Sequence, residues 1–536
     1  MFQKKIKKNY LFFLFFGLII FTLFLNNSFN YLDPDLGWHL KAGQDIWQNK
    51  EVSLVNHYNY TLKDKDWVNH EWLVDLGSFL IFENFGYIIL SIIFALMSTL
   101  VVILLFYLIK IINDKNKYLK NFYLIFSLLG YFMLAPSFGV RMQVMGILNL
   151  VLLLIIIAKY DKEPKYNYLL CLIPLFLFWA NAHASFLFGL AILFLYLFVK
   201  IISHINLIKK IKFINTGKIL SKKKIFLLFI FILSSLVITL LNPYGLELYS
   251  FLKGYGNTFY LSYISEWLPI YHLPINYYTV SYISIFLALI FLNFKYLKNK
   301  ISINIFWWLL IFLTIIMAIK SKRNSTLLLI SSFPVMIALA QAIFSKEELN
   351  ILKNKINYYI NNKIFKIFFI IIYLLLLFKI SLTTSFTNKP FQAYCNKYPC
   401  QAVNLIKERA DLKELKMLNN YDWGGYLIWV WPEKQLFIDG RMPQLEYEKH
   451  TILEEYVDFF DEDKLKKHLE KHQINLILMN KVKEIKEKDS TWYKAIDKKL
   501  KNNSKNNLIK FLKDSDNWEQ IFTDDISIIY VKKTSL

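Results

Sequence analysis

The chain has 536 residues, of which 56% are hydrophobic and 18% aromatic, and its formal net charge is +23. This content of apolar and aromatic residues is far above that of soluble proteins, so it excludes an ordinary globular enzyme and indicates a polytopic membrane protein. No nucleic-acid partner is needed to explain the positive charge, because much of it comes from lysine-rich loops between apolar runs and from a lysine-rich tail.

The first apolar run, YLFFLFFGLIIFTLFL, covers residues 10–25 and follows the basic stretch KKIKK. This order of charged and apolar residues is typical of a signal peptide, but no cleavage site made of small residues follows the run. The run is therefore predicted to be an uncleaved first membrane helix.

Further apolar runs approach the ~20 residues that a membrane span requires. They predict a mainly α-helical transmembrane bundle of about 11 spans, and an odd number of spans places the two termini on opposite sides of the membrane. The predicted spans after the first cover residues 86–109, 121–136, 143–158, 167–180, 184–203, 224–242, 277–294, 303–319, 326–344 and 364–382.

Lysine content alternates between the loops, and this alternation predicts the orientation of the bundle. Gaps such as KIINDKNKYLK and KKIKFINTGKILSKKK are rich in lysine, and positive charge is retained in the cytoplasm, so the N-terminus is predicted inside. The frequent isoleucine, lysine and asparagine residues are typical of an AT-rich bacterial genome, so we expect a multi-pass protein of the bacterial cytoplasmic (inner) membrane. The segments predicted outside are residues 26–77, 136–142, 181–183, 243–276 and 320–325 and the region after 383.

Long apolar runs stop after Leu382, so residues 1–382 are predicted to form the transmembrane domain and residues 383–536 a small extracytoplasmic α/β domain. Cys395 and Cys400 fall in this external region, where they could form a disulfide, although two free thiols fit the sequence equally well. Strand-like runs cover residues 426–431, 435–440, 474–479 and 526–531, and helical patterns cover residues 401–415 and 461–472.

The large first external loop, residues 26–77, contains the stretch DPDLGWH, which holds Asp33, Asp35 and His39. Two carboxylates at a membrane surface can share a divalent cation such as Mg²⁺ or Mn²⁺ with a phosphate, or one of them can act as a general base. The structural alternative is an Asp-Pro turn that only caps the following helix.

The same loop carries more polar residues before it returns to the membrane. His57 lies in NHYNYT, and His70 and Glu71 lie in WVNHEWL. Trp67 and Trp72 fit an interfacial aromatic belt, but such a belt needs no ionisable groups. The two histidines and Glu71 are therefore candidate substrate-binding residues.

Polar residues also occupy other predicted outer ends of the spans, where ionisable groups are functional candidates by default. Arginine offers a fork that matches phosphate oxygens, whereas snorkelling of long side chains to lipid headgroups explains these cations equally well. The candidates are Arg141, His183, Glu266, Lys322 and Arg323, with Asn181 close to His183 in the sequence.

The tail contains the stretches DWGGYLIW and FIDGR. They predict a strand, a Gly-Gly bend and a second strand, with a turn at Asp439, Gly440 and Arg441. The functional alternative is that Asp422, Asp439 and Arg441 face the membrane cavity and contact the acceptor or the sugar.

The motifs DPDLGWHLKAGQDI, NHYNYT, WVNHEWL, WANAHASFLFGLAI, LNPYGLELY and YDWGGYLIWVWPEKQLFIDGR follow one another along nearly the whole chain. Together they resemble a group of bacterial membrane proteins related to GT-C glycosyltransferases, and more distantly the catalytic subunit of oligosaccharyltransferases. That subunit has an Asp-x-Asp-like signature in its first external loop and a Trp-Trp-Asp-Tyr-Gly motif. The counterpart here, residues 421–426, has the acid and tryptophan in a different order, so acceptor-sequon recognition is not expected.

The resemblance implies an enzyme that transfers a sugar from a polyprenyl phosphate or pyrophosphate to a cell-envelope glycan or protein. It also implies that Asp33 and Asp35 are catalytic or metal-binding, and His39 is a secondary catalytic candidate. Arg141, Lys322 and Arg323 would then hold the phosphate of the donor. Two alternatives are a non-catalytic flippase for lipid-linked glycans and a scaffold for envelope assembly.

Three other chemistries have no sequence signature here. The chain shows no Walker loop, no clustered cysteines and histidines at zinc spacing, and no Gly-x-Ser-x-Gly nucleophile elbow. Their absence favours a substrate that brings its own leaving group.

Overall fold

The computed structural model describes most of the chain, with gaps between the segments. The predicted span at 121–136 and the start of the first predicted span lie outside the described residues. The described segments are 17–112, 138–205, 215–256, 258–272, 277–297, 303–343, 362–383, 386–481 and 502–535, apart from a few single positions.

The chain groups into two compact units, each built from three separate segments. The helical unit comprises Met1–Tyr31, Ile89–Gly245 and Ser265–Phe386, and the mixed unit comprises Leu32–Ile88, Leu246–Ile264 and Thr387–Leu536. Most of the loop predicted at 26–77 therefore belongs to the same unit as the region after 383. Whether 383–536 also folds by itself stays a prediction.

Helices account for nearly all of the described helical unit, and they coincide with the predicted spans within a few residues. A helix covers residues 17–30, and α3 (Trp72–Ile112) enters this unit after a kink at Gly86. The others are α5 (Gln143–Lys162), α6 (Tyr166–Leu170), α7 (Leu172–Ala182), α8 (Phe186–Ile202), α10 (Lys222–Ile238), α13 (Tyr277–Leu292), α14 (Ile305–Lys320), α15 (Ser325–Ile343) and α17 (Lys363–Thr383).

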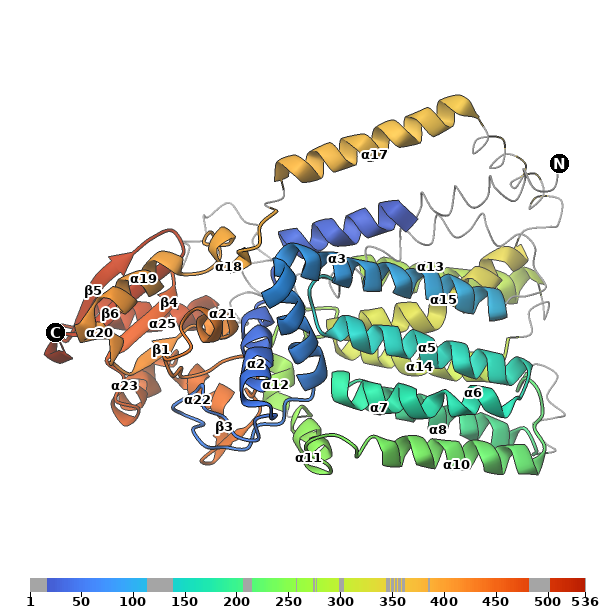
Figure 1. Ribbon diagram of the computed structural model, residues 1–536, viewed down its shortest axis with the longest axis horizontal. Coiled ribbons are helices and arrows are strands. Elements are labelled where there is room, and N and C mark those ends of the chain that lie inside the picture. The colour runs from blue at the N-terminus through green and yellow to red at the C-terminus, as the bar shows by residue number, and fades with distance from the viewer. Residues whose placement is uncertain are drawn as a thin grey trace. The chain divides into compact units, whose positions relative to one another are not determined.

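These helices pack side by side, with α10 against α7 and α8, and α14 against α8 and α15 (Figure 1). Helix α15 is buried along most of its length, whereas large apolar side chains of α10 and α17, such as Phe226 and Phe368, are exposed. Exposed apolar faces of this kind suit contact with lipid tails, which are as apolar as leucine.

Four helices in the described part of the chain are long and apolar enough to cross a membrane. The predicted number of about 11 spans is larger, partly because several apolar helices are shorter than a full span. The four are Trp72–Ile112, Gln143–Lys162, Tyr277–Lys295 and Lys322–Ile343.

The mixed unit contains a four-stranded sheet in the order β1-β4-β6-β5, in which β1 runs parallel to β4 and the other neighbours are antiparallel. Helix α19 packs on β6 and α25 packs on β5 (Figure 1). The strands are β1 (Met417–Asn419), β2 (Glu446–Tyr447), β3 (His450–Thr451), β4 (Leu476–Asn480), β5 (Trp518–Thr523) and β6 (Ser527–Lys532). The helices are α2 (Leu36–Asn49), α11 (Glu247–Gly254), α12 (Thr258–Tyr263), α18 (Pro390–Ala393), α19 (Cys400–Glu408), α20 (Ala410–Lys413), α21 (Gly424–Val430), α22 (Ile452–Asp458), α23 (Glu462–Lys471) and α25 (Asn502–Asp514).

The strand predictions in this unit are only partly correct. The runs at 474–479 and 526–531 correspond to β4 and β6, but the run at 426–431 lies in helix α21, and 435–440 forms only one isolated bridge, at Leu436. A short apolar run does not distinguish a buried helix from a buried strand. Helix α21 is buried along most of its length, so its sequence lacks the polar face that would have marked a helix.

Close packing explains why glycines stand where the helices of this unit cross. A Cβ atom on Gly37 of α2 would lie 2.1 Å from the carbonyl oxygen of Gly425 in α21, and one on Gly425 would lie 2.2 Å from the carbonyl oxygen of Pro34. A Cβ atom on Gly43 would lie 2.3 Å from the carbonyl oxygen of Asp75 in α3. Any side chain at these positions would collide with backbone.

The first loop is joined to the tail by backbone hydrogen bonds. Leu436 N–H donates to Tyr58 O at 2.8 Å, and Tyr60 N–H donates to Leu436 O at 3.1 Å. The hydroxyl of Thr61 donates to Phe437 O at 2.5 Å. Elsewhere in the unit, Cys395 and Cys400 form a disulfide. Of the two alternatives that the sequence allowed, the structure therefore has the disulfide and not two free thiols.

Candidate functional site

Asp33 and Asp35 begin helix α2, and their carboxylates have different surroundings. The backbone N–H of Asp35 donates to Asp33 Oδ1 at 2.9 Å, and Leu36 N–H donates to Asp33 O at 3.1 Å. Asp33 thus forms the Asp-Pro turn considered as the structural alternative. Asp35 is the N-cap residue of α2 by position, but its side chain makes no capping hydrogen bond.

The carboxylate of Asp35 instead lies against the DGR stretch of the tail. A Cβ atom on Gly440 would lie 2.5 Å from Asp35 Oδ1 and 3.5 Å from Asp35 Cγ. The absence of a side chain at Gly440 therefore makes room for this carboxylate.

His39 lies one turn further along α2 and is buried. Its Nδ1 atom is 2.6 Å from Asp75 Oδ1, and its Nε2 atom is 3.8 Å from Glu71 Oε2. Burial lowers the pKa of His39, but Asp75, with smaller contributions from Glu71 and Asp35, raises it to about 9. His39 is therefore protonated at neutral pH.

The residues at the end of the first loop hold this arrangement in place. Asn69 donates from Nδ2 to Asp75 Oδ2 at 2.8 Å and accepts the backbone N–H of Glu71 at 3.1 Å. His70 lies 4.0 Å from Glu71 Oε2, and its ring faces Phe251 and Tyr255 at centroid distances of 6.2 and 6.0 Å. Asp75 was not predicted, although a carboxylate at the start of an apolar run is a signal that could have found it.

Asp439 and Arg441 form a buried ion pair that also holds the first loop. Arg441 donates to both carboxylate oxygens of Asp439 at 2.9 and 2.8 Å, and to the side-chain oxygens of Asn56 and Asn59 at 2.9 and 2.8 Å. Its guanidinium lies over the rings of Tyr58 and Trp67, at 4.4 and 4.5 Å from their centroids. We call these six residues the arginine clamp; in it Arg441 has a positioning role, and substrate contact by Arg441 stays a prediction.

Asp422 is exposed and lies in the 3-10 turn Tyr421–Trp423, directly before α21. Its backbone N–H donates to Asn420 Oδ1 at 2.9 Å. Burial raises the pKa of Tyr421 well above its usual value, and Tyr260, Asp35, Asp422 and Asp439 add to the effect. Carboxylates of the first loop and of the tail therefore all raise the pKa of the same tyrosine. We call Asp33, Asp35, His39, Glu71, Asp75, Asp422 and Asp439 the acidic site.

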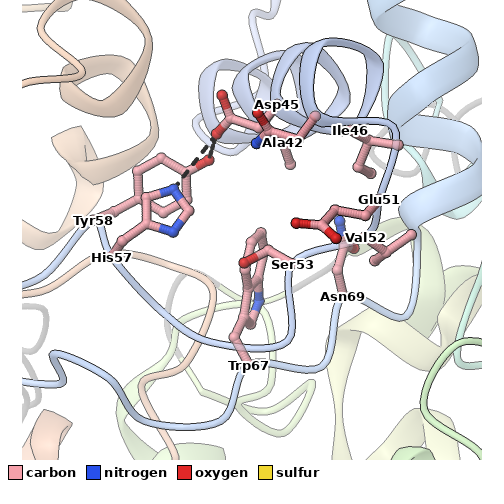
Figure 2. A pocket seen from close by; sticks show the side chains of 11 residues that line it. Ala42, Asp45, Ile46, Glu51, Val52, Ser53, His57, Tyr58, Trp67 and Asn69 are labelled. Atoms are coloured by element: carbon pink, nitrogen blue, oxygen red, sulfur yellow. Dashed lines mark hydrogen bonds and ion pairs between the residues drawn. The ribbon is translucent and has the colours of Figure 1, made fainter.

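A pocket of about 160 Å³ opens beside the arginine clamp and is lined by α2 and the first loop. Figure 2 shows Asp45 of α2 facing Tyr58 and His57. The Tyr58 hydroxyl donates to Asp45, and His57 Nε2 lies 3.6 Å from Asp45 Oδ2. Trp67 also lines the pocket, so it belongs to both features. The sequence predicted His57 alone, because nothing in its spacing relates it to Asp45.

In the helical unit, Glu266 joins two of the predicted cations. Arg141 donates to Glu266 Oε1 at 3.0 Å, and Arg323 donates to Glu266 Oε2 at 3.4 Å. Burial raises the pKa of Glu266, but Arg141 and Arg323 outweigh this effect and lower it. Arg323 also stacks on Trp267 at 5.0 Å, and Lys322 N–H donates to Leu268 O at 2.9 Å.

His183 follows α7 in the same unit, where its Nδ1 atom lies 2.8 Å from the hydroxyl of Ser185. Asn181 donates to the carbonyl oxygens of Leu177 and Leu241 at 2.8 and 3.0 Å. These bonds position the α7–α8 connection and the end of the chain segment after α10. Substrate contact by His183 stays a prediction.

The oxygen atoms of the acidic site suit a hard divalent cation. Asp33 and Asp35 offer carboxylates two residues apart, and Gly440 leaves space beside one of them. Carboxylate oxygen is the ligand that Mg²⁺ and Mn²⁺ prefer. Metal binding by the two aspartates stays a prediction, whereas Asp439 is already paired with Arg441.

Comparisons with known proteins agree with the distant likeness predicted from the motifs. No family model matches the chain, and no curated protein matches it in sequence. Its fold is similar to that of the oligosaccharyltransferase AglB from Archaeoglobus fulgidus, solved in complex with an inhibitory peptide and a dolichol-phosphate: the TM-score is 0.54 at 10% identity, over 92% of this chain and 71% of that one.

A structure of the Archaeoglobus fulgidus oligosaccharyltransferase in the apo form gives a TM-score of 0.51 at 12% identity, over 96% of this chain and 74% of that one. At these identities the likeness concerns the fold. The predicted distant similarity to the catalytic subunit of oligosaccharyltransferases is confirmed, and the chain shares the fold of these archaeal proteins.

Proposed function

We propose that the chain is a GT-C-type glycosyltransferase of the bacterial cytoplasmic membrane. It transfers a sugar from a polyprenyl phosphate or pyrophosphate to a cell-envelope glycan or protein on the outer face. The observation that carries this proposal is the position of Asp35, whose carboxylate lies against Gly440 within the acidic site of an oligosaccharyltransferase-like fold. The dolichol-phosphate bound to the archaeal neighbour supports a lipid-linked donor.

The proposed reaction needs a base and a stabilised leaving group. The acceptor hydroxyl or amide attacks the anomeric carbon, its proton passes to the Asp35 carboxylate, and the bond from the anomeric carbon to the phosphate oxygen breaks. Asp33 and Asp35 would hold a divalent cation, which would stabilise charge on the departing phosphate. Protonated His39, paired with Asp75, keeps one positive charge among the carboxylates of the site.

The two arginines bound to Glu266 are the proposed phosphate-binding groups. Two guanidinium groups share the Glu266 carboxylate, and the Glu266 side chain is 37% exposed. An arginine fork matches phosphate oxygens, so a phosphate can replace part of this carboxylate contact. Lys322 stays a candidate for the same role.

The test is sugar transfer by the purified full-length protein in lipid, with radiolabelled polyprenyl phosphate and pyrophosphate sugars, with and without Mg²⁺ or Mn²⁺. Asp35→Asn keeps the shape of the side chain and removes its charge. We expect it to lower transfer at least 10²-fold, the lower end of the range for general acid-base catalysis. Asp66→Asn, an exposed aspartate of the same loop, is the matched control and should retain full activity.

Two outcomes would favour the alternatives. A flippase would consume no donor, and lipid-linked glycan would still cross vesicle membranes at a similar rate with Asp35→Asn. A scaffold would lose function when residues 383–536 are deleted but would tolerate changes at Asp33 and Asp35. Donor consumption that depends on Asp35 would exclude both.

A further inference from the structure

A second polar cluster lies in the mixed unit and plays no part in the proposed reaction. Its centre is Glu455 of α22, whose side chain is fully buried. The carboxylate lies 2.5 Å from His450 Nε2, 2.9 Å from His468 Nδ1, 2.6 Å from His472 Nε2 and 2.9 Å from Lys471 Nζ. Three imidazoles thus converge on one carboxylate.

Local structure brings these side chains together from three elements. His468 and His472 are four residues apart at the end of α23, so they lie on one face of that helix. His450 belongs to β3, and Glu455 follows it in α22, whose N-terminus is fixed by a capping box at Thr451. The geometry therefore depends on regular structure rather than on flexible loops.

The surroundings of the cluster resemble those of a metal centre. The second ring nitrogen of His468, Nε2, lies 3.6 Å from Asp458 Oδ2, and metal-bound histidines usually face a carboxylate in this way. Phe437 and Phe459 pack against His472 at centroid distances of 5.0 and 5.8 Å. This aromatic wall excludes water from one side of the imidazoles.

We propose that Glu455, His468 and His472 bind a Zn²⁺ ion and that His450 is the fourth ligand. The ligand atoms of the first three residues lie within 4.8 Å of one another. Tetrahedral ligands at zinc distances of ~2.1 Å are roughly 3.4 Å apart. The imidazoles therefore need to move back from the carboxylate by less than about 1 Å, and the ligand atoms that are up to 4.8 Å apart need to come closer by up to about 1.4 Å. Imidazole nitrogen and carboxylate oxygen are both common zinc ligands.

Lys471 is the group that competes with the ion. Its ammonium bonds Glu455 and also Glu448 at 2.9 Å, and its side chain is 29% exposed. The side chain can therefore turn toward Glu448 when the ion binds. Burial raises the pKa of Glu455, but hydrogen bonds from His472, Lys471 and His450 lower it well below its usual range.

The spacing of cysteines and histidines along the sequence did not predict this site. Only His468 and His472 have a zinc-like spacing, and the other two ligands come from β3 and α22. A bound ion would join β3, α22 and α23, so its role is to stabilise the mixed unit rather than to act on the sugar.

The first experiment measures the metal content and affinity of the full-length protein, purified in detergent with a tag that contains no histidine. We expect about one Zn²⁺ per chain by elemental analysis. After removal of the metal by a chelator, Zn²⁺ alone should raise the midpoint of thermal unfolding, because an ion that binds only the folded state stabilises it. Added Co²⁺ should give the absorption bands of a tetrahedral site.

The matched variants are His468→Gln with His472→Gln, and His272→Gln as the control histidine in the helical unit. The double variant should lose stoichiometric Zn²⁺ and the Co²⁺ bands, whereas His272→Gln should keep both. A double variant that still binds one Zn²⁺ per chain would overturn the proposal.

Lys471→Gln separates a metal site from a purely hydrogen-bonded network. It removes a positive charge beside the ion, so Zn²⁺ affinity should rise at least tenfold. In a network without metal, Lys471→Gln would destabilise the protein equally in Zn²⁺ and in chelator. That result would overturn the proposal without affecting the test of sugar transfer.

Discussion

Each unit of the molecule contains an arginine–carboxylate contact, and the two contacts differ in exposure. In the helical unit, Arg141 and Arg323 share the Glu266 carboxylate, whose side chain is 37% exposed. In the mixed unit, Asp439 and Arg441 pair one to one, and their side chains are 2% and 0% exposed. The first contact joins two arginines to one partly exposed carboxylate, and the second joins one arginine to one buried carboxylate.

This difference separates groups that can exchange partners from groups that fix structure. An exposed ion pair contributes little to stability, with typical values up to about 1 kcal/mol. Removing one partner of a buried pair leaves an uncompensated buried charge and costs roughly 3–5 kcal/mol. We therefore expect the Glu266 contact to affect substrate binding and the arginine clamp to affect folding.

The largest expected effect on stability is that of Arg441→Met, which keeps the length of the side chain and removes its charge. We expect the free energy of unfolding to fall by about 3–5 kcal/mol, because the buried Asp439 carboxylate then loses its cationic partner and keeps only the backbone N–H of residue 441. Arg323→Met is the control and should change it by less than about 1 kcal/mol. Denaturant titration of the purified protein gives both values.

A second variant tests whether the charge or the cavity is responsible. Adding Asp439→Leu to Arg441→Met removes the unpaired carboxylate and should recover part of the lost stability, because apolar pairs often replace buried ion pairs well. Equal losses at Arg441 and Arg323 would show that the two contacts are not different in kind.

The next largest expected loss of stability comes from a substitution where α2 and α21 cross. Gly425→Ala places a Cβ atom 2.2 Å from the carbonyl oxygen of Pro34, so α2 and α21 must separate. We expect a loss of about 1–3 kcal/mol, typical of overpacking. Gly77→Ala adds the same atom in α3 where nothing lies within 4 Å, and it should be neutral or stabilising. A similar loss in both variants would contradict the close approach.

Gly440→Ala separates activity from stability, because it displaces the Asp35 carboxylate and leaves the residues of the arginine clamp unchanged. The new Cβ atom would lie 2.5 Å from Asp35 Oδ1, at the movable end of that side chain. Stability should change by less than about 1 kcal/mol. Sugar transfer should fall roughly 10²-fold, the scale expected when a catalytic group is displaced by about 1 Å. Unchanged transfer would remove Asp35 from the proposed mechanism.

The smallest expected effect concerns pH. The pKa of His39 is raised from 6.5 to about 9 in the folded protein, so its pairing with Asp75 stabilises the fold fully below about pH 6.5, and this stabilisation is lost as the pH rises through 9. The midpoint of thermal unfolding should fall between these pH values in the parent protein. In His39→Gln this part of the pH dependence should be absent; an unchanged profile would assign it to another group.

The sequence predicted the helices of the helical unit well, because each apolar run is long and ends near lysines. The predicted span at 143–158 corresponds to α5, and the one at 303–319 corresponds to α14. The sequence failed at α21, where a run that is apolar on all sides has no helical periodicity. It could not predict the kink at Gly86, since many glycines in apolar helices leave them straight.

The candidate site was predicted in part for a similar reason. Asp33, Asp35 and His39 stand out because ionisable residues cluster at the end of an apolar run. Asp75 lies at the start of an apolar run and Asp45 in an ordinary amphipathic helix, and only the fold shows that they contact His39 and His57. Contacts between residues far apart in the chain cannot be read from local periodicity.

The arginine clamp also determines when the mixed unit can be completed during synthesis. Arg441 bonds Asn59 across 382 positions of the chain. At a typical elongation rate of 5–20 residues per second, the first loop emerges roughly 20–80 s before its partner. Throughout that interval the faces of Tyr58 and Trp67 that Arg441 will cover have no partner from the tail. A ribosome that stops before residue 441 therefore releases a chain with every described helix of the bundle and an unassembled acidic site.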